Sequence, residues 1–168
     1  MEATSSAAAR IEVKGYTLIV DKEDEPRVKS LAWQLSPSKS GRMHFTNGFV
    51  GRLSRWLVDA PDDMHVDHRN GNTLDNRKSN LRVCTHQQNQ WNRKRAPGVS
   101  RFKGVAHWKN GLNGRVWRAR IEKDGQRHFL GDFPTQLAAA LAYDAAAIEL
   151  FGEFAAPNFP ERFRARSK

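Results

Sequence analysis

Residues 134–152 form the longest run of strong helix formers in the chain. The run reads PTQLAAALAYDAAAIELFG and contains no Lys or Arg. Its larger apolar residues recur at helical spacing: Leu137, Leu141, Ile148 and Phe151. Gly152 stands where helices commonly end. We therefore expect one long helix whose alanines allow it to lie close against another layer.

The segment VWRARI, residues 116–121, predicts that other layer. It alternates with period two, so apolar residues and arginines fall on opposite faces: Trp117, Ala119 and Ile121 against Arg118 and Arg120. Neighbouring strands are expected at 103–109 and 127–132, with turns at Asn113-Gly114 and Asp124-Gly125. The carboxyl-terminal part should therefore be a three-stranded antiparallel sheet packed on one α-helix.

Basic charge is concentrated in one segment of the sequence. The chain has 168 residues, with 28 Lys+Arg and 18 Asp+Glu, and a formal net charge of +10. Residues 1–91 carry 13 basic and 11 acidic residues, whereas residues 92–129 carry 11 and 2. Such segregation is expected when one surface faces the phosphates of a nucleic acid. A generic solvated basic surface is the alternative interpretation.

Composition also excludes several classes of protein. The single cysteine, Cys84, rules out a disulfide framework within the chain and a zinc site made of several cysteines. No apolar run approaches the roughly 18–20 residues needed to span a bilayer. The opening MEATSSAAAR lacks the apolar region of a secretory signal. We expect a soluble protein of a reducing compartment, cytoplasmic in a bacterial or phage-infected cell and not secreted.

The amino-terminal part predicts a small α+β scaffold without obvious chemistry of its own. Strand-like pieces at 11–20 and 32–53 flank a short helix from Asp21 to about Ser30, with an acidic first turn. Combined with the carboxyl-terminal sheet and helix, this gives the α+β fold class.

Residues 64–92 predict a strand, a polar loop, a second strand and a helix. The strands, MHVDH and LRVC, are joined by an Asn-rich loop. Thr85 followed three residues later by Gln88 is a capping-box pattern, which places the start of the helix near His86. The next segment, RKRAPGVS at 93–100, contains three basic residues and a Pro-Gly pair, as is typical of a linker.

Asp67 and His68, at the end of the first of these strands, form a candidate site, with Asn89 on the following helix. A carboxylate offers a hard oxygen ligand, and an imidazole with an ordinary pKa near 6.5 offers a general base. The amide oxygen of Asn89 could complete a cation site. From the residues alone, a structural role for His68 and turn-forming roles for the asparagines stay open.

The stretch VDHRNGNTLDNRKSNLRVCTHQQNQWN, residues 66–92, closely resembles the HNH endonuclease motif in its phage- and intron-type form. In that family, a ββα unit binds one divalent ion and cleaves a DNA phosphodiester. The resemblance implies that His68 is the general base that activates water and that Asp67 is a metal ligand. It also implies that Asn80 braces the two-stranded turn and orients the base, and that Asn89 is the other metal ligand.

The same resemblance implies a magnesium ion, with Mn²⁺ as the alternative, and no structural zinc. His86 competes with Asn89 as a ligand because it lies three residues earlier on the same helical face, and spacing favours Asn89. Asp67 supplies one charge and Asn89 a neutral oxygen, so we expect weak metal binding without DNA. In the region before the motif, Ser54-Arg55 stands where proteins of this family usually have a His-Arg pair.

Residues 101–160 closely resemble the APETALA2/ethylene-response-factor (AP2/ERF) DNA-binding domain through FKGV, VWRARI, FLGDF, AYDAAA and FGEFAAPNF. That family lays a three-stranded sheet in the major groove of DNA. The resemblance and the strand alternation together imply six DNA-contacting residues: Lys103, Trp108, Arg118, Arg120, Arg127 and Phe129. Plant members carry Glu at the position of Arg120 and Trp at that of Phe129, so their target sequence is not expected here. Simple phosphate contact is the alternative for each arginine.

The leading hypothesis is a sequence-directed DNA endonuclease of homing or phage type that acts on double-stranded DNA as a monomer, with no protein partner and no membrane. The alternatives are a non-catalytic DNA-binding transcriptional regulator and a nonspecific nucleic-acid-binding protein. The predicted organisation comprises a disordered tail (1–10), an HNH endonuclease domain (11–92, with a ββα-metal core at about 64–92), a basic linker (93–100), an AP2/ERF-like domain (101–160) and a basic tail (161–168).

Overall fold

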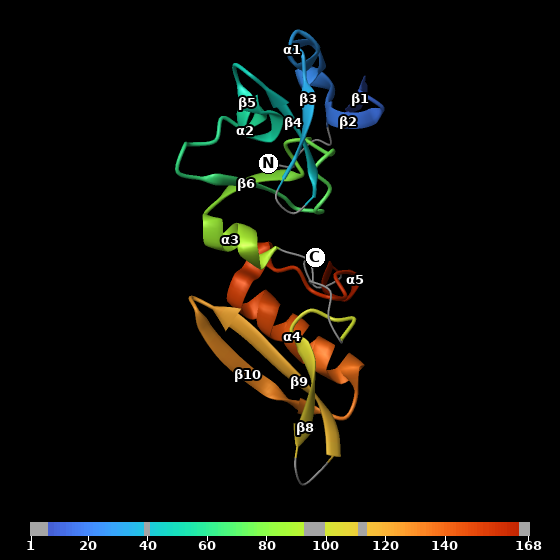
Figure 1. Ribbon diagram of the computed structural model, residues 1–168, viewed down its shortest axis with the longest axis vertical. Coiled ribbons are helices and arrows are strands. Elements are labelled where there is room, and N and C mark those ends of the chain that lie inside the picture. Colours follow the sequence, from blue (N-terminus) through green and yellow to red (C-terminus); the bar gives the residue numbers. More distant parts are fainter. Residues whose placement is uncertain (1–6, 39–40, 93–99, 111–113, 165–168) are drawn as a thin grey trace. The chain divides into compact units, whose positions relative to one another are not determined.

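The protein has an α+β fold of helices and small antiparallel sheets, as predicted (Figure 1). The computed structural model describes the following parts of the chain: residues 7–38, 41–92, 100–110 and 114–164. The chain divides into two compact units, residues 1–89 and residues 90–168. We call them unit 1 and unit 2 and describe each by itself.

Unit 1 is built from small antiparallel sheets that follow one another along the chain. The strands are β1 (Ala8–Val13) paired with β2 (Tyr16–Asp21), then β3 (Gln34–Pro37), β4 (Met43–Asn47) and β5 (Gly51–Arg52) in that order, and finally β6 (His65–His68) paired with β7 (Leu81–Cys84). The helical segments are η1 (Lys22–Asp24), α1 (Glu25–Lys29), α2 (Leu53–Leu57) and α3 (His86–Trp91), the last of which ends in unit 2.

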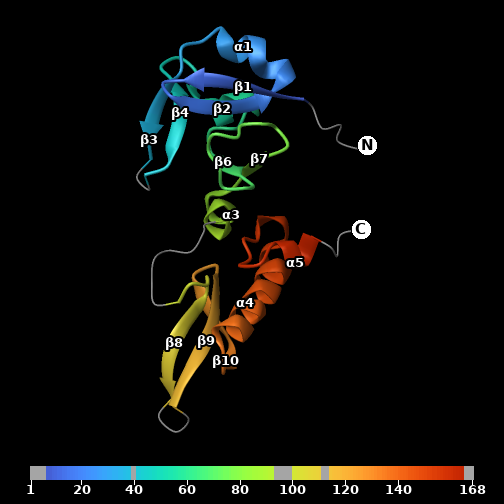
Figure 2. The ribbon, with the colours of Figure 1, turned by 90° about the vertical axis from the view of Figure 1, so that its right-hand side faces the viewer.

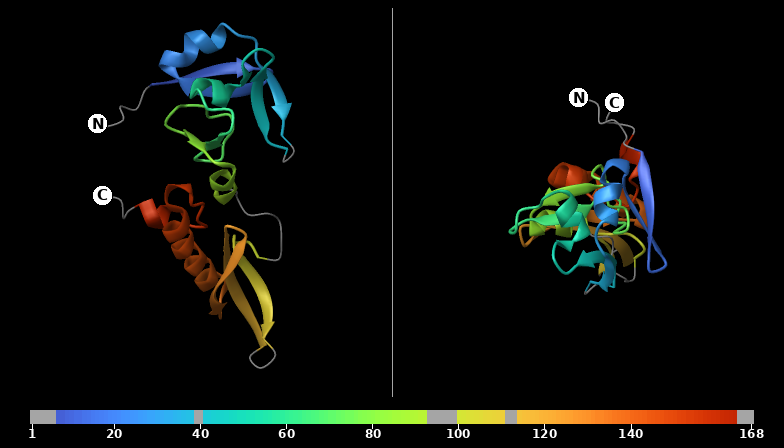
Figure 3. Two further views of the ribbon diagram at one scale, coloured as in Figure 1. Left: turned by 90° about the vertical axis from the view of Figure 1, so that its left-hand side faces the viewer. Right: turned by 90° about the horizontal axis from the view of Figure 1, so that it is seen from above.

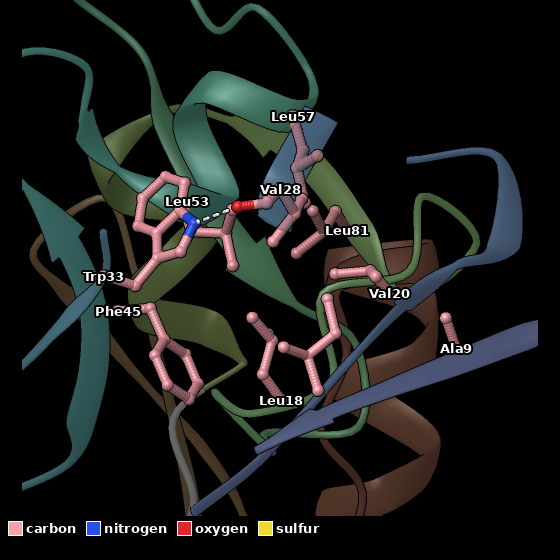
Figure 4. Packing of buried hydrophobic residues seen from close by; sticks show 10 residues of the cluster. Ala9, Leu18, Val20, Val28, Trp33, Phe45, Leu53, Leu57 and Leu81 are labelled. Atoms are coloured by element: carbon pink, nitrogen blue, oxygen red, sulfur yellow. Dashed lines mark hydrogen bonds between the residues drawn. The ribbon is translucent and has the colours of Figure 1, made fainter. Parts of the chain in front are cut away.

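The core of unit 1 gathers apolar side chains from the β1–β2 hairpin, the β3–β5 sheet and α2 (Figure 4). Leu18, Phe45 and Leu53 are almost completely buried. Each such side chain stabilises the fold by about 1.5–3 kcal/mol through removal of apolar surface from water. The indole Nε1 of Trp33 donates a hydrogen bond of 2.8 Å to the carbonyl of Val28, so this buried polar group is satisfied.

The loop between β6 and β7, residues 69–80, is anchored on β2 (Figure 2). The amide of Ile19 donates to the carbonyl of Leu74 at 2.9 Å, and the amide of Asn76 donates to the carbonyl of Ile19 at 2.7 Å. A side-chain contact adds to these, because Asp21 Oδ2 accepts from the amide of Lys78 at 2.7 Å. A polar loop without regular structure is thereby held in one conformation beside the end of β6.

Unit 2 contains the predicted sheet and helix. The strands β8 (Val105–Asn110), β9 (Gly114–Lys123) and β10 (Gln126–Phe133) form an antiparallel sheet with β9 in the centre, and α4 (Gln136–Phe151) packs along one face of it (Figure 3). The segments η2 (Gly152–Phe154) and α5 (Glu161–Arg164) follow. Asp124 and Gly125, both at positive φ, make the predicted tight turn between β9 and β10.

Small residues bring α4 close to the sheet. Ala139, Ala140 and Ala147 on the helix are fully buried, and so is Ala119 on β9. The closest approach is at Gly104, where an added Cβ would lie 1.9 Å from Cδ2 of Tyr143. The alanine-rich composition of the helix therefore serves close packing, as the sequence predicts.

Asp144, fully buried on α4, anchors the chain that follows the helix. Its Oδ1 accepts hydrogen bonds from the backbone amide and side-chain Nδ2 of Asn158 at 2.7 and 2.9 Å, and its Oδ2 accepts from the amide of Phe159 at 2.9 Å. Asn158 in turn accepts from the amide of Lys103 at 2.7 Å. These hydrogen bonds join α4, the segment before β8 and the segment after η2.

The ends of the ordered regions differ from the predicted ones. Ala8, Ala9 and Arg10 belong to β1 rather than to a disordered tail, because they pair with β2 and Ala9 is buried in the core. Likewise, residues 161–164 of the predicted basic tail form α5. Residues 93–99 of the predicted linker lie outside the described residues.

Candidate active site and candidate DNA-reading face

Asp67 and His68 lie side by side at the end of β6, and both are buried. The strand is short and antiparallel to β7, with Asp67 opposite Arg82. Arg55 on α2 supports the chain that enters β6, because its guanidinium donates hydrogen bonds to the carbonyls of Ala60 and Met64. The arginine of the Ser54-Arg55 pair therefore supports the backbone before the candidate site.

The carboxylate of Asp67 forms a buried ion pair with Arg82. Arg82 Nη2 and Nε lie 2.6 and 2.9 Å from Asp67 Oδ2, and both residues are buried. Because a buried carboxylate without a cation is costly, the ion pair with Arg82 offsets part of the cost of burying Asp67. Arg82 is not among the residues predicted from the sequence, because its position opposite Asp67 depends on the register of β6 and β7.

The imidazole of His68 is held by Asn76, a residue that sequence analysis also missed. His68 Nε2 lies 3.2 Å from Asn76 Oδ1, and Asn76 Nδ2 donates to the carbonyl of Thr73 at 3.1 Å. Since the amide nitrogen is used by Thr73, the oxygen faces the ring and accepts a hydrogen bond from Nε2–H. Burial lowers the pKa of His68, and the contact with Asn76 opposes that shift.

Asn80 braces the loop between β6 and β7. Its Nδ2 donates to the carbonyl of Asp75 at 2.7 Å, and its Oδ1 accepts from the amide of Asn70 at 3.1 Å. The side chain of Asp75 is bound by Arg77 at 2.7 and 2.8 Å, and this arginine lowers the pKa of the carboxyl. These bonds of Asn80 tie the loop backbone together, while the contact to the ring of His68 comes from Asn76.

Helix α3 begins at the predicted capping box. Gln88 N donates to Thr85 Oγ1 at 3.2 Å, and Thr85 N donates to Gln88 Oε1 at 2.8 Å. Asn89 is half-buried on this helix. The ring of His86 packs edge-on against that of His65, with centroids 5.0 Å apart. His86 and Asn89, the two candidate ligands, thus lie on the helix that follows β7. The ring of His86 is engaged by its contact with His65.

The donor set of this site suits a hard cation. Asp67 and Asn89 offer oxygen ligands, which Mg²⁺ prefers, and Mg²⁺ commonly retains several waters. No group of three or more His, Cys, Asp or Glu in the described parts of the chain could hold a metal ion. Asp67 and Asn89 stay the predicted ligands of such an ion.

In unit 2, five of the six predicted DNA contacts gather on the face of the sheet that is turned away from α4. Trp108 and Phe129 expose 42% and 61% of their surface. The guanidinium of Arg118 lies over both rings, 4.2 Å from the first centroid and 5.0 Å from the second, and that of Arg120 lies 5.1 Å from Trp108. Arg118, Arg120, Arg127 and Phe129 line an open cavity of about 370 Å³.

The arginines of this face differ in their partners. Arg118 makes a two-point ion pair with Asp132, with Nε–Oδ1 and Nη2–Oδ2 distances of 2.6 and 2.7 Å. Arg127 makes a single exposed contact of 3.2 Å with Glu122. Asp132 was not foreseen from the sequence, although the strand pairing places it opposite Arg118.

Lys103 lies apart from the other five. Its Nζ donates to the carbonyl of Trp91 at 2.7 Å and lies 5.9 Å from the ring centroid of Tyr143 on α4. Burial lowers its pKa to about 8. The ammonium group is therefore directed toward the helix side of unit 2 and away from the exposed sheet face.

Comparison with known proteins places these features in a family. The model of the family described as HNH endonuclease matches residues 59–91. A protein of Acanthamoeba polyphaga mimivirus, named as an uncharacterized HNH endonuclease, is 42% identical over 153 residues, which cover 86% of this chain and 76% of the viral protein. The chain belongs to the HNH endonuclease family.

This chain also shares a segment with plant proteins. It is 48% identical over 61 residues to an AP2/ERF and B3 domain-containing protein of Oryza sativa subsp. japonica. It is 50% identical over 64 residues to an AP2-like ethylene-responsive transcription factor of Arabidopsis thaliana. These matches cover 36% and 37% of this chain but only 16% and 18% of the plant proteins. An HNH endonuclease segment and an AP2/ERF-related segment are thus joined in one chain, as predicted.

Among the residues that the structure describes, no helix is long and apolar enough to cross a membrane.

Proposed function

We propose that this protein is a metal-dependent endonuclease that hydrolyses phosphodiesters of double-stranded DNA, with His68 as the general base. The observation that carries this proposal is the hydrogen bond between His68 and Asn76 at the end of β6. If Asn76 accepts from Nε2–H, the proton of the neutral ring sits on Nε2. Nδ1 is then the nitrogen that takes a proton from the attacking water.

The burial of His68 supports this role. It lowers the pKa of the ring, so at neutral pH the imidazole is mostly neutral and able to accept a proton. A base is useful only in the unprotonated form, and a surface histidine with an ordinary pKa near 6.5 would be partly protonated just below pH 7.

Asp67 and Asn89 would hold a divalent cation, Mg²⁺ or in its place Mn²⁺. When bound, such an ion neutralises charge on the phosphate as a Lewis acid. Arg82 fixes the Asp67 carboxylate through Oδ2 and thereby orients the group that would bind the ion. With only one charged ligand, the free protein should bind the ion weakly, and phosphate oxygens of DNA and water molecules would complete the shell.

The exposed face of the β8–β10 sheet would direct the enzyme to DNA. Arg120, next to Trp108, is the residue that we propose as a base-reading group, because a guanidinium can donate two hydrogen bonds to guanine. Arg118 is held by Asp132 and would instead fix the aromatic rings on either side. For Lys103 to contact DNA, its ammonium would have to leave the carbonyl of Trp91.

The proposal is tested by a cleavage assay on supercoiled and linear DNA with Mg²⁺ or Mn²⁺. We expect nicked or cut product with either ion and none in excess EDTA. His68→Ala should abolish product, whereas His128→Ala, which removes an exposed histidine of β10, should not. If the wild-type chain binds DNA but cuts none with either ion, the enzyme is excluded and the DNA-binding regulator takes its place.

A further inference from the structure

The β3–β5 sheet of unit 1 has two unlike faces. Leu35 and Phe45 pack into the core. The strand register places the residues of the alternate positions together on the other face, all of them polar: Gln34, Ser36, His44, Thr46 and Arg52. Ser36 Oγ and Thr46 Oγ1 are hydrogen-bonded at 2.8 Å. Arg42, two residues before His44 and directly before β4, continues this alternation in the sequence.

This polar face carries positive and no negative charge. Residues 26–58 contain six Lys+Arg and no Asp or Glu, although residues 1–91 as a whole are nearly neutral. Arg42 and Arg52 are exposed, and within the described residues of unit 1 neither forms an ion pair with a carboxylate. A surface with unpaired guanidinium groups and no acid attracts anions.

The polar face adjoins the candidate active site. The loop that follows His68 docks on β4, where Thr73 Oγ1 donates to the carbonyl of Met43 at 2.6 Å. Thr73 also accepts from the side chain of Asn76, which holds the ring of His68. A short chain of hydrogen bonds therefore links His68 to the backbone next to His44.

The pKa of His44 also reflects its closeness to His68. Burial, followed by the positive charges of Arg52, His68 and Arg42, lowers the pKa of His44 to about 4. At neutral pH, His44 is therefore uncharged and can donate one hydrogen bond from its ring.

We propose that Arg42, His44 and Arg52 form a phosphate-binding face, which holds the backbone of the DNA strand that enters the active site at His68. The inference rests on the proposed nuclease function and adds a substrate contact to it. Guanidinium groups bind phosphate through two parallel hydrogen bonds, so Arg42 and Arg52 would grip the strand. His44 would donate to the phosphate nearest the scissile bond. This face positions the strand and reads no base.

The test compares Arg42→Gln and Arg52→Gln with Arg10→Gln in the full chain. Arg10 is also exposed but lies on β1, in a different sheet, and is the matched control. The measurements are kcat/KM for DNA cleavage and the slope of log binding constant against log salt concentration. We expect each of the first two variants to lower kcat/KM by about tenfold or more and to reduce the salt slope by about 1.

A wild-type kcat/KM and an unchanged salt slope in Arg42→Gln and Arg52→Gln would overturn the proposal. So would an equal loss in Arg10→Gln, since the effect would then reflect bulk charge. Melting temperatures should stay unchanged because the replaced side chains are exposed. His44→Gln, which keeps a hydrogen-bond donor, should lose less activity than His44→Ala. If the wild-type chain cuts no DNA, the nuclease function fails separately, and the salt slopes alone decide whether the face binds phosphate.

Discussion

At the scale of single residues, the contact between Asn76 and His68 makes a prediction about which ring nitrogen carries the proton. Asn76 Nδ2 is engaged by the carbonyl of Thr73, so only Oδ1 faces the ring and the tautomer with a proton on Nε2 is favoured. We expect ¹⁵N NMR of the histidine side chains at neutral pH to show His68 as the Nε2–H tautomer. Asn76→Ala should give a mixture of tautomers. A wild-type ring that is protonated on Nδ1, or on both nitrogens, would contradict this assignment.

The buried pair of Asp67 and Arg82 makes a prediction about stability. Arg82→Met would remove the ion-pair partner of a buried carboxylate, which should lower the free energy of unfolding by about 3–5 kcal/mol. Urea denaturation measures this loss. The double variant Asp67→Asn with Arg82→Met removes both charges and should regain part of the stability. A single variant as stable as the wild type would mean that the carboxylate does not depend on Arg82.

The residues of the candidate site differ in whether the sequence alone could predict them. Asp67, His68 and Asn80 were predicted through the resemblance of their segment to the HNH motif. Asn76 and Arg82 were not, because each acts through a contact that depends on the conformation of the loop or on strand register.

At the scale of secondary-structure elements, close packing of α4 on the sheet depends on Gly104. This residue has φ +75°, and an added Cβ would overlap the ring of Tyr143. Gly104→Ala should therefore destabilise unit 2 by about 2–5 kcal/mol, from the left-handed backbone and the overlap together. Gly125→Ala is the matched control, since Gly125 has the same φ and open space around it. It should cost only about 1–2 kcal/mol in thermal or urea unfolding. Equal losses would show that the contact with Tyr143 contributes nothing.

The outer face of β9 makes a prediction about specificity. Arg120→Ala should relax the preference at one base pair by about 1–3 kcal/mol, whereas Arg118→Ala should weaken binding to all sequences because Arg118 supports Trp108 and Phe129. A selection from randomised DNA, followed by affinity measurements on single-base variants, distinguishes the two. Uniform weakening in Arg120→Ala would make that residue a phosphate contact.

The elements themselves follow from local patterns where those patterns are regular. Period-two alternation predicts β9, and the alanine-rich run predicts α4. The anchoring of the 69–80 loop on β2 was not predictable, because its hydrogen bonds join segments more than fifty residues apart. Ala8 was expected in a disordered tail, although its pairing with Asp21 places it in a strand.

At the scale of the whole molecule, the proposed function assigns the chemistry to unit 1 and the recognition of DNA to unit 2. Unit 1 is nearly neutral in total, but its charge is arranged so that a basic sheet face borders His68. Unit 2 carries the concentrated basic charge, and the outer face of its sheet carries the exposed rings of Trp108 and Phe129. Phosphate contacts position a protein on DNA, while base contacts select the sequence. We therefore expect cleavage and binding to be separable by mutation.

The most direct test measures both properties in one variant. The cleavage rate at saturating protein with Mg²⁺ and the DNA affinity with Ca²⁺ in its place are compared between the wild type and His68→Ala. We predict that the variant retains the affinity of the wild type and loses at least about a hundredfold in rate, the minimum expected when a general base is removed. Cleavage at the wild-type rate by His68→Ala would contradict the assignment of this histidine as the base.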